Sequence, residues 1–420
     1  MNLFDKVIAG EFRKTGATKK ISVPGNDGSN YDVYAIPLKY LYYNDQNGRI
    51  NTAYRQYQSE NGVLAPEPGD SEYNQIFEKF VLDSNSQALK DTLKSIKEKT
   101  QQEPGVVLPD GRVIDGNRRF TALRMYQRET NIEKYFEAVI LNLDTAKKSD
   151  EKTIKELELD LQLGREERVD YDPIDRIFDV YNTIKIEKLM TVDEYKKASG
   201  AGNTRGINRD LRLAELILRF ISLVSPGGNA IDKFYLARDL KIDGPIEEIG
   251  GTLDKLTGDD KEAVTDAVLV RLLLAKSGLE TAEPKIVMRD MKNKILKNPD
   301  IKSHLVDATE DDDKLDDIVD AFVKKPIASA AELKQRINED EHLKSQAARY
   351  IKSTNRLAFK GDKDGKRRKS LSELEDIYEK LSVMSASDFT ELNVDENAEA
   401  KDTLKDISDV VFKLKKELRM

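Results

Sequence analysis

The chain contains no cysteine, and only two of its 420 residues are histidine, His304 and His342. The lack of cysteine excludes thiol catalysis and disulfide bonds, and two distant histidines do not make an ordinary zinc site. Both histidines lie in charged, helix-like stretches without a nucleophile signature, so a Ser-His-Asp arrangement is not expected. No apolar run approaches the roughly 18 residues of a membrane span, and the N-terminus does not read as a signal peptide. We therefore expect a cytoplasmic protein without a membrane partner.

Neither charge sign dominates strongly. The formal net charge is −8, with 35% charged and 39% hydrophobic residues. An acidic total argues against a protein that coats nucleic acid indiscriminately, but charge can be partitioned between domains, so DNA binding stays open. The apolar share suffices for several cores, and the length allows two to four domains.

The N-terminal third alternates short strand-like and helix-like segments after a lead segment, residues 1–30. The order is strand, turn-rich loop, amphipathic helix, hairpin, helix and strand, at residues 31–38, 44–49, 87–99, 106–114, 117–129 and 136–142. Such a succession is typical of a small α+β domain, which we place at residues 31–150.

The most informative motif is Asp115-Gly-Asn-Arg-Arg119, between the predicted hairpin and the following helix. Glycine lets backbone N–H groups approach an anion closely. Two arginines then open a helix whose N-terminus already carries partial positive charge. The motif is the outline of a phosphate cradle, although taken alone it more often means a capped helix with exposed arginines.

From Lys152 onward nearly everything is predicted to be helical. Thr191-Val-Asp-Glu194 is a capping box that begins one helix, and Gly200-Ala-Gly202 separates it from a second helix that begins near Asn203. Tyr195, Ala198, Ile207 and Leu211 would pack inward between the two helices. The polar residues left outside are Asn203, Thr204, Arg205, Asn208, Arg209 and Arg212.

These outward side chains are the types that contact DNA bases and phosphates, so residues 151–225 predict a helical linker followed by a helix-turn-helix. The alternative is an ordinary helical hairpin with a polar surface. The turn is about one residue longer than usual, which favours that alternative slightly.

The C-terminal half carries weaker signals. Residues 225–229 break the helical pattern, and a further helical domain is predicted at 226–305. Residues 306–420 combine an acidic linker, in which a metal site is the less favoured alternative, with a C-terminal helical region. Within it, residues 361–369 are predicted to form a flexible basic loop, by default a solvated turn and alternatively a contact to DNA phosphate.

Two stretches there have heptad spacing. The first is Leu371, Leu374, Tyr378 and Leu381, and the second is Leu404, Ile407, Val411, Leu414 and Leu418. They predict either an internal antiparallel hairpin or a dimer seam, and the sequence does not choose between them.

The order of these motifs resembles the ParB family of chromosome and plasmid partition proteins over residues 31–225. Residues 36–49 are similar to that family's first box, with Asn44 and Arg49 matching its asparagine and arginine. Gly116-Asn-Arg-Arg119 is similar to its Gly-Glu-Arg-Arg-x-Arg box. Thr121 stands in place of the third arginine, for which Arg124 is a substitute one turn later.

The resemblance continues less cleanly towards the predicted helix-turn-helix. Residues 168–175 are similar to the family's Arg-x-Asp-Leu-Asn-Pro-Ile-Glu segment, after an apparent insertion. The acid that would meet a metal is unresolved among Glu158, Asp160, Glu166 and Glu167, of which we select Asp160 and Glu167. The same fold includes sulfiredoxin, whose activity Asn117 and the absence of cysteine exclude.

The resemblance implies a ParB/sulfiredoxin-like α+β domain, an all-α helix-turn-helix domain and an extended all-α C-terminal region. It implies a nucleoside triphosphate, CTP or ATP, with magnesium. The residues that would hold the nucleotide are Asn44, Arg49, Gly116, Asn117, Arg118, Arg119 and Thr121. Implied partners are DNA and a second copy of the chain, with a nucleoid-associated role in partition.

Two other functions stay open. One is a slow nucleotide hydrolase or a metal-dependent nuclease of a mobile element or anti-phage system, because arginines and carboxylates together permit phosphoryl chemistry. The other is a non-enzymatic adaptor whose acidic C-terminal half binds a protein partner.

Overall fold

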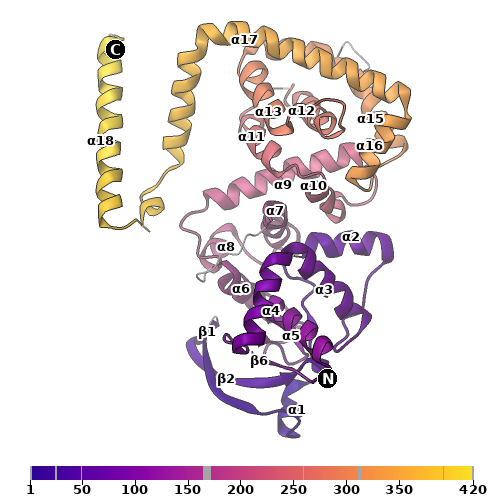
Figure 1. Ribbon diagram of the computed structural model, residues 1–420. Helices are drawn as coiled ribbons and strands as arrows, with labels where there is room; N and C mark the ends of the chain where they lie inside the picture. The colour runs from indigo at the N-terminus through magenta and orange to yellow at the C-terminus, as the bar shows by residue number, and fades with distance from the viewer. Residues whose placement is uncertain are drawn as a thin grey trace. The chain divides into compact units, whose positions relative to one another are not determined.

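The computed structural model describes residues 2–23, 26–48, 50–163, 172–258, 260–310, 314–390 and 392–418. The chain forms two compact units, residues 1–362 and residues 363–420. The first unit contains a mixed sheet with its helices and a larger all-helical part (Figure 1). This is the coarse organisation predicted from the sequence, a mixed α/β part followed by helices.

The sheet has six strands in the order β1-β2-β6-β4-β5-β3. Their bounds are β1 Lys14–Val23, β2 Asn26–Pro37, β3 Tyr42–Tyr43, β4 Gly105–Val107, β5 Arg112–Asp115 and β6 Tyr135–Ile140. β2 pairs antiparallel with β1 and β6, and β4 lies parallel to β6. The predicted strands at 31–38 and 136–142 and the predicted hairpin at 106–114 are therefore confirmed.

The first 30 residues take part in this sheet. Besides the short helix α1 (Leu3–Ile8), they supply β1 and the start of β2. Ile21 and Val23 are the buried residues of β1, whereas most of the strand is exposed. A lead segment was expected because such an edge strand, with a single buried face, has a weak hydrophobic signal.

Helices cover both faces of the sheet. One face packs against α2 (Asn51–Asn61), α3 (Glu72–Ser84), α4 (Ser86–Lys99) and α5 (Asn117–Thr130). The other face packs against α6 (Lys148–Leu163), through Ile154 and Leu157. Neighbouring residues in a strand serve opposite faces: Val107 belongs to the first core and Val106 to the second.

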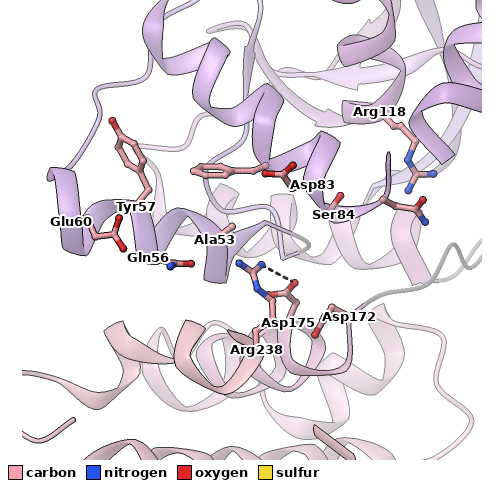
Figure 2. Close-up of a pocket in the computed structure, with 12 residues that line it drawn as sticks. Ala53, Gln56, Tyr57, Glu60, Asp83, Ser84, Arg118, Asp172, Asp175 and Arg238 are labelled. Carbon is pink, nitrogen blue, oxygen red and sulfur yellow. Dashed lines mark ion pairs between the residues drawn. The ribbon is translucent and has the colours of Figure 1, made fainter. Parts of the chain in front are cut away.

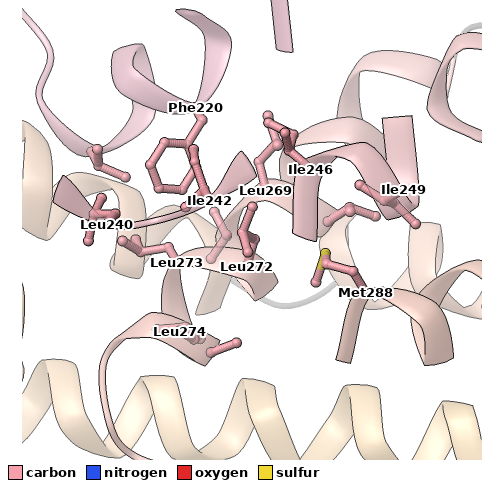
Figure 3. Close-up of a cluster of buried hydrophobic side chains, with 14 of the residues drawn as sticks. Phe220, Leu240, Ile242, Ile246, Ile249, Leu269, Leu272, Leu273, Leu274 and Met288 are labelled. Atoms are coloured by element: carbon pink, nitrogen blue, oxygen red, sulfur yellow. The ribbon is translucent and has the colours of Figure 1, made fainter. Parts of the chain in front are cut away.

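The helical part of the first unit has one continuous core, which runs from Ile174 to Leu357. It includes helices on both sides of residues 225–229, where the helical pattern is interrupted. Figure 3 shows part of it, with Phe220, Ile246 and Leu269 gathered from three helices. The elements are α7 Pro173–Tyr181, η2 Asn182–Ile186, α8 Val192–Ala198, α9 Arg205–Val224, η3 Ala230–Lys233, α10 Tyr235–Asp239, α11 Asp243–Asp254, α12 Lys261–Lys276, α13 Pro284–Asp290, η4 Met291–Leu296, α14 Pro299–Glu310, α15 Lys314–Lys324, α16 Ala330–Glu339 and α17 Glu341–Val383.

Two predictions for the C-terminal half are corrected. Residues 361–369 lie inside helix α17 and do not form a loop. Gly361 is buried there, and a Cβ at this position would lie 1.7 Å from the carbonyl oxygen of Lys294 in η4. Glycine therefore permits a close helix contact at a position where the sequence suggested a turn. The acidic run at 307–320 likewise belongs largely to α14 and α15.

The second unit contains the end of α17, the short helix η5 (Ala386–Phe389) and α18 (Val394–Glu417). The apolar residues of the two heptad stretches are largely exposed: Leu374 by 51%, Tyr378 by 72% and Leu404 by 47%. Across the described ranges, no helix has the combination of length and apolarity required to cross a bilayer.

Candidate functional site

Gly116 turns the chain from β5 into α5 and leaves the first turn of that helix open. Its φ is +94°, and an added Cβ would meet Phe136 at 2.9 Å, so a side chain is excluded both by conformation and by space. The first main-chain bond of the helix runs from the N–H of Phe120 to the carbonyl of Gly116. The N–H groups of residues 117–119 thus precede the helical ladder, as in anion-binding helix N-termini.

A cleft of about 540 Å³ lies at this helix start, with walls from α3, α4, β5 and α6. The four predicted residues Gly116, Asn117, Arg118 and Arg119 all line it. Side-chain oxygen Oδ1 of Asn117 is buried there and has no hydrogen-bond partner in the part of the chain that the structure describes. A buried amide without a partner is costly unless a ligand or water completes it.

A second cleft of about 450 Å³ adjoins the first, and Arg118 and Ser84 line both. One wall comes from α2 and α3, including Tyr57, and the other includes Asp175 of α7 and Arg238 of α10. In Figure 2, Arg118 and Arg238 enter this cleft from opposite sides. Arg118 is thus a charged side chain that lines both clefts.

Arg119 is held by the protein itself. Its guanidinium donates to a carboxylate oxygen of Asp115 at 3.1 Å and to the carbonyl of Glu103 at 2.7 Å. Lys19 of β1 also pairs with Asp115, at 3.3 Å. Arg119 therefore lies at the edge of the cleft in a fixed position, held by its ion pair with Asp115.

Two residues that were expected at the phosphate site, Thr121 and Arg124, do not line the cleft. Thr121 is fully buried, and its hydroxyl bonds the carbonyl of Asn117 at 2.8 Å and the hydroxyl of Tyr43 at 2.7 Å. Arg124, the expected substitute for a third arginine, is buried and donates to Glu78 at 3.0 Å. One helical turn beyond the cleft, both side chains face the protein interior.

The loop after β3 places its asparagines differently from what the sequence predicted. Asn44 is 1% exposed, and its side-chain oxygen accepts from the N–H of Gln46, so it stabilises the loop from within. Asn47, three residues later, lines the cleft instead. The conformation of the turn decides which asparagine lines the cleft, and the sequence pattern does not reveal that conformation. Arg49, predicted to close over the nucleotide, lies outside the described residues.

The residues described do not test the predicted magnesium site. They contain no cluster of three or more carboxylates or histidines that could hold a metal. Asp160 lines neither cleft, and Glu158 is buried beside Lys155, at 3.5 Å. Glu166 and Glu167 lie outside the described residues. Magnesium therefore stays a prediction from the resemblance.

Asp175 is the titratable group that the sequence analysis left without a role. It is 3% exposed, accepts a hydrogen bond from the hydroxyl of Thr52, and lies 3.7 Å from Arg238. Burial raises the pKa of its carboxyl from 3.8 to about 7, although Arg238 and Thr52 oppose that rise. Such a carboxyl in a cleft is suited to proton exchange near neutral pH. The available sequence signals were the capping residue Asp172, three positions earlier, and the family-like segment at residues 168–175, which ends at Asp175.

Helices α8 and α9 form a pair joined by residues 199–204. The capping box of Thr191 and Glu194 is present, and Tyr195, Ile207 and Leu211 are buried between the helices, as predicted. The hydroxyl of Tyr195 also donates to Asp179 at 3.1 Å, and Lys155 donates to the same carboxylate at 2.5 Å. This buried network connects the helix pair to α6 and α7.

The outward side chains of the pair divide into two groups. At the start of α9, Arg205 is exposed, and Asn203 and Thr204 are half-buried. Further along, Arg209 pairs with Glu247 at 2.9 Å and Arg212 with Asp254 at 2.6 Å, both acids belonging to α11. Asn208, which lies between Arg205 and Arg209 in the sequence, is half-buried. Two of the predicted DNA-binding arginines are thus neutralised by a neighbouring helix.

No protein-family profile matches the chain, and no curated protein matches it. Among solved structures, the chain is similar to a Pnob8-like ParB-N domain, with 14% sequence identity and a TM-score of 0.31. The match covers 66% of this chain and 98% of that domain. At this level the likeness says nothing of ligands or partners.

Proposed function

We propose that this protein is a ParB-like, nucleotide-dependent DNA-binding protein whose triphosphate site is the cleft at the start of α5. The observation that carries the proposal is the position of Arg118, which lines both adjoining clefts beside the open helix start. Phosphates at residues 116–118 would accept from the first-turn N–H groups and from the guanidinium. The nucleoside, CTP or ATP in the proposal, would extend into the adjoining cleft.

The site has the size and donors that a nucleotide needs. Each cleft has the volume of an ordinary small-molecule site. The unpartnered amide of Asn117 adds a polar group at the helix start, and rotation of that amide offers either an acceptor or donors. Arg119 would mainly stabilise the edge of this cleft through its ion pair with Asp115.

Nucleotide binding would couple to DNA through contacts between the two parts of the first unit. α2 contacts the helical part through Thr52, which donates to Asp175, and through Arg55, which pairs with Asp232 at 2.6 Å. A ligand between these elements favours whichever arrangement it contacts best. In the proposal, the α8–α9 pair is a helix-turn-helix whose exposed start at Arg205 contacts DNA, and the nucleotide switches DNA loading.

Calorimetric titration of CTP, ATP, GTP and UTP, each with magnesium, tests the nucleotide site. Arg118→Ala should weaken binding of the preferred nucleotide by roughly ten- to a hundredfold, because charge-assisted hydrogen bonds to phosphate are lost. Arg128→Ala is the matched control, since Arg128 lies in the same helix but pairs with Glu78 away from both clefts. Equal affinities for the parent and the Arg118→Ala protein would remove the proposal.

A further inference from the structure

Helices α6 and α7 each extend from a cleft of the candidate site into the interior of the first unit. Leu161, near the end of α6, lines the cleft at the start of α5. Asp175, in the first turn of α7, lines the adjoining cleft. About one or two turns further from the clefts, α6 carries Lys155 and α7 carries Asp179. Each helix therefore connects a cleft wall to a position in the interior.

A buried ion pair joins the two helices at that depth. The amine of Lys155 donates to Asp179 at 2.5 Å, and the two residues are 8% and 3% exposed. The hydroxyl of Tyr195, in α8, donates to the other oxygen of the same carboxylate at 3.1 Å. Separating a buried charge from its partner is costly, because the charge is then left uncompensated. Displacement of either helix is therefore expected to carry the carboxylate and the tyrosine with it.

Lys155 has a second acid within reach, which gives the ion pair an alternative arrangement. Glu158, one turn later in α6 and 2% exposed, lies 3.5 Å from the amine. The lysine therefore lies between an acid of its own helix and an acid of α7. Coupling between distant sites requires an element with discrete arrangements of this kind, which both sites can bias.

The apolar contacts around Tyr195 follow the same route. Tyr195 packs in a small core together with Leu159 of α6 and Val180 of α7. The same core contains Ile207 and Leu211 of α9, the second helix of the predicted helix-turn-helix. A change in the spacing of α6 and α7 would thus reach α8 and α9 through close packing as well as through the carboxylate.

We propose that Lys155, Asp179 and Tyr195 are positioning residues that transmit occupancy of the clefts to the α8–α9 pair. A ligand against Leu161 and Asp175 would shift α6 relative to α7, and the ion pair would carry that shift to Tyr195. The three residues line neither cleft, so they act without touching the ligand. The inference rests on the proposed function for its ligand, a nucleoside triphosphate, and adds the residues through which the site is regulated.

Hydrogen exchange of the full-length protein, with and without a saturating nucleotide, tests this relay. In the parent protein, the nucleotide that binds in calorimetry should change exchange rates of α8 amides by roughly fivefold or more, the lower end of ordinary coupling. Tyr195→Phe removes only the hydroxyl. This variant should bind the nucleotide with the affinity of the parent, but the change in α8 should be lost.

Tyr350→Phe is the matched control. It removes another buried hydroxyl, which donates to the carbonyl of Ala267 at 2.9 Å within the core of the helical part. This variant should retain both the nucleotide affinity and the change in α8. A merely structural loss of a buried hydrogen bond would affect the two variants alike, so the difference between them reports the relay.

The outcomes separate the relay from the nucleotide site. A parent protein that binds nucleotide without a change in α8, or a Tyr195→Phe variant that keeps the change, would overturn the relay and leave the nucleotide site standing. A parent protein that binds none of the four nucleotides would overturn both. If circular dichroism shows that Tyr195→Phe is unfolded, Lys155→Met with Asp179→Leu replaces it, because apolar replacement of a buried ion pair is often tolerated. That double variant should also lose the change in α8, and keeping it would count against the relay.

Discussion

At the scale of single residues, the candidate site depends on which polar side chains line its clefts. Arg118 and Arg119 are neighbours of the same type and both line the first cleft, but Arg118 also lines the second, whereas Arg119 pairs with Asp115 at the edge of the first. Thr121 and Asn44 are also of types that bind nucleotides, but both are buried and bonded within the protein. Residue type therefore predicted where the site lies, and the tertiary structure decided which of these side chains line its clefts.

The buried carboxyl of Asp175 should leave a signature in stability against pH. Its pKa in the folded protein is about 7, above the ordinary value of 3.8, so the unfolded chain loses this proton first as pH rises. The group's contribution to the free energy of unfolding is therefore fully present below pH 4. It decreases between pH 4 and 7 by up to roughly 4 kcal/mol, and changes no further at higher pH.

Asp175→Asn removes that titration and can still accept the hydrogen bond from Thr52. We expect the melting temperature of the variant, relative to the parent, to increase from pH 4 to pH 7 and then level off. Glu262→Gln, which removes an exposed carboxylate that lines neither cleft, is the control for general effects of losing a carboxylate. A melting difference that does not change across this pH interval would contradict a raised pKa.

At the scale of elements, the two sides of α9 make different kinds of contact. Its inner side contributes Leu213, Phe220 and Val224 to the core of the helical part. Its outer side carries Arg209 and Arg212, which pair with acids of α11. Part of the positive charge of α9 is therefore cancelled by the acids of α11, which would weaken any contact between this side of the helix and DNA phosphates.

Neutralising the acids of α11 should increase DNA binding if α9 faces DNA. The Glu247→Gln and Asp254→Asn double variant frees two arginines for phosphate contacts. We expect tighter binding and a salt dependence of log K that is steeper by up to about 2. Fluorescence anisotropy with duplex DNA at several salt concentrations measures both quantities.

Glu262→Gln is the control, since its partner Arg219 lies later in the same helix. If the double variant and the parent share one salt slope, then these arginines do not meet phosphate and the helix pair has another role.

At the scale of the whole molecule, the two compact units differ in what stabilises them. The first has continuous cores on both sides of its sheet and through its helical part. In the second, α18 has no buried residue at all. The first unit is therefore expected to fold within one chain, and α18 to depend on association.

Thermal unfolding should report this difference as two transitions in far-ultraviolet circular dichroism. Raising the protein concentration roughly tenfold should shift the α18 transition upward, because dimers dissociate as they unfold. The main transition of the first unit should stay at the same temperature. Leu404→Asp with Val411→Asp should remove the concentration dependence, and a concentration-independent curve for the parent protein would be inconsistent with a dimer seam at these heptads.

The sequence by itself determined the features whose causes lie within a few residues. Among them are the hairpin before Gly116, the helix after it, the capping box at Thr191 and the heptad phase of α18. Tertiary structure alone decided that Arg119 is engaged, that Asn47 rather than Asn44 reaches the cleft, and that Gly361 lies inside a helix. Local patterns depend on backbone geometry and short-range spacing, whereas pairing, burial and close approach depend on residues far apart in the chain.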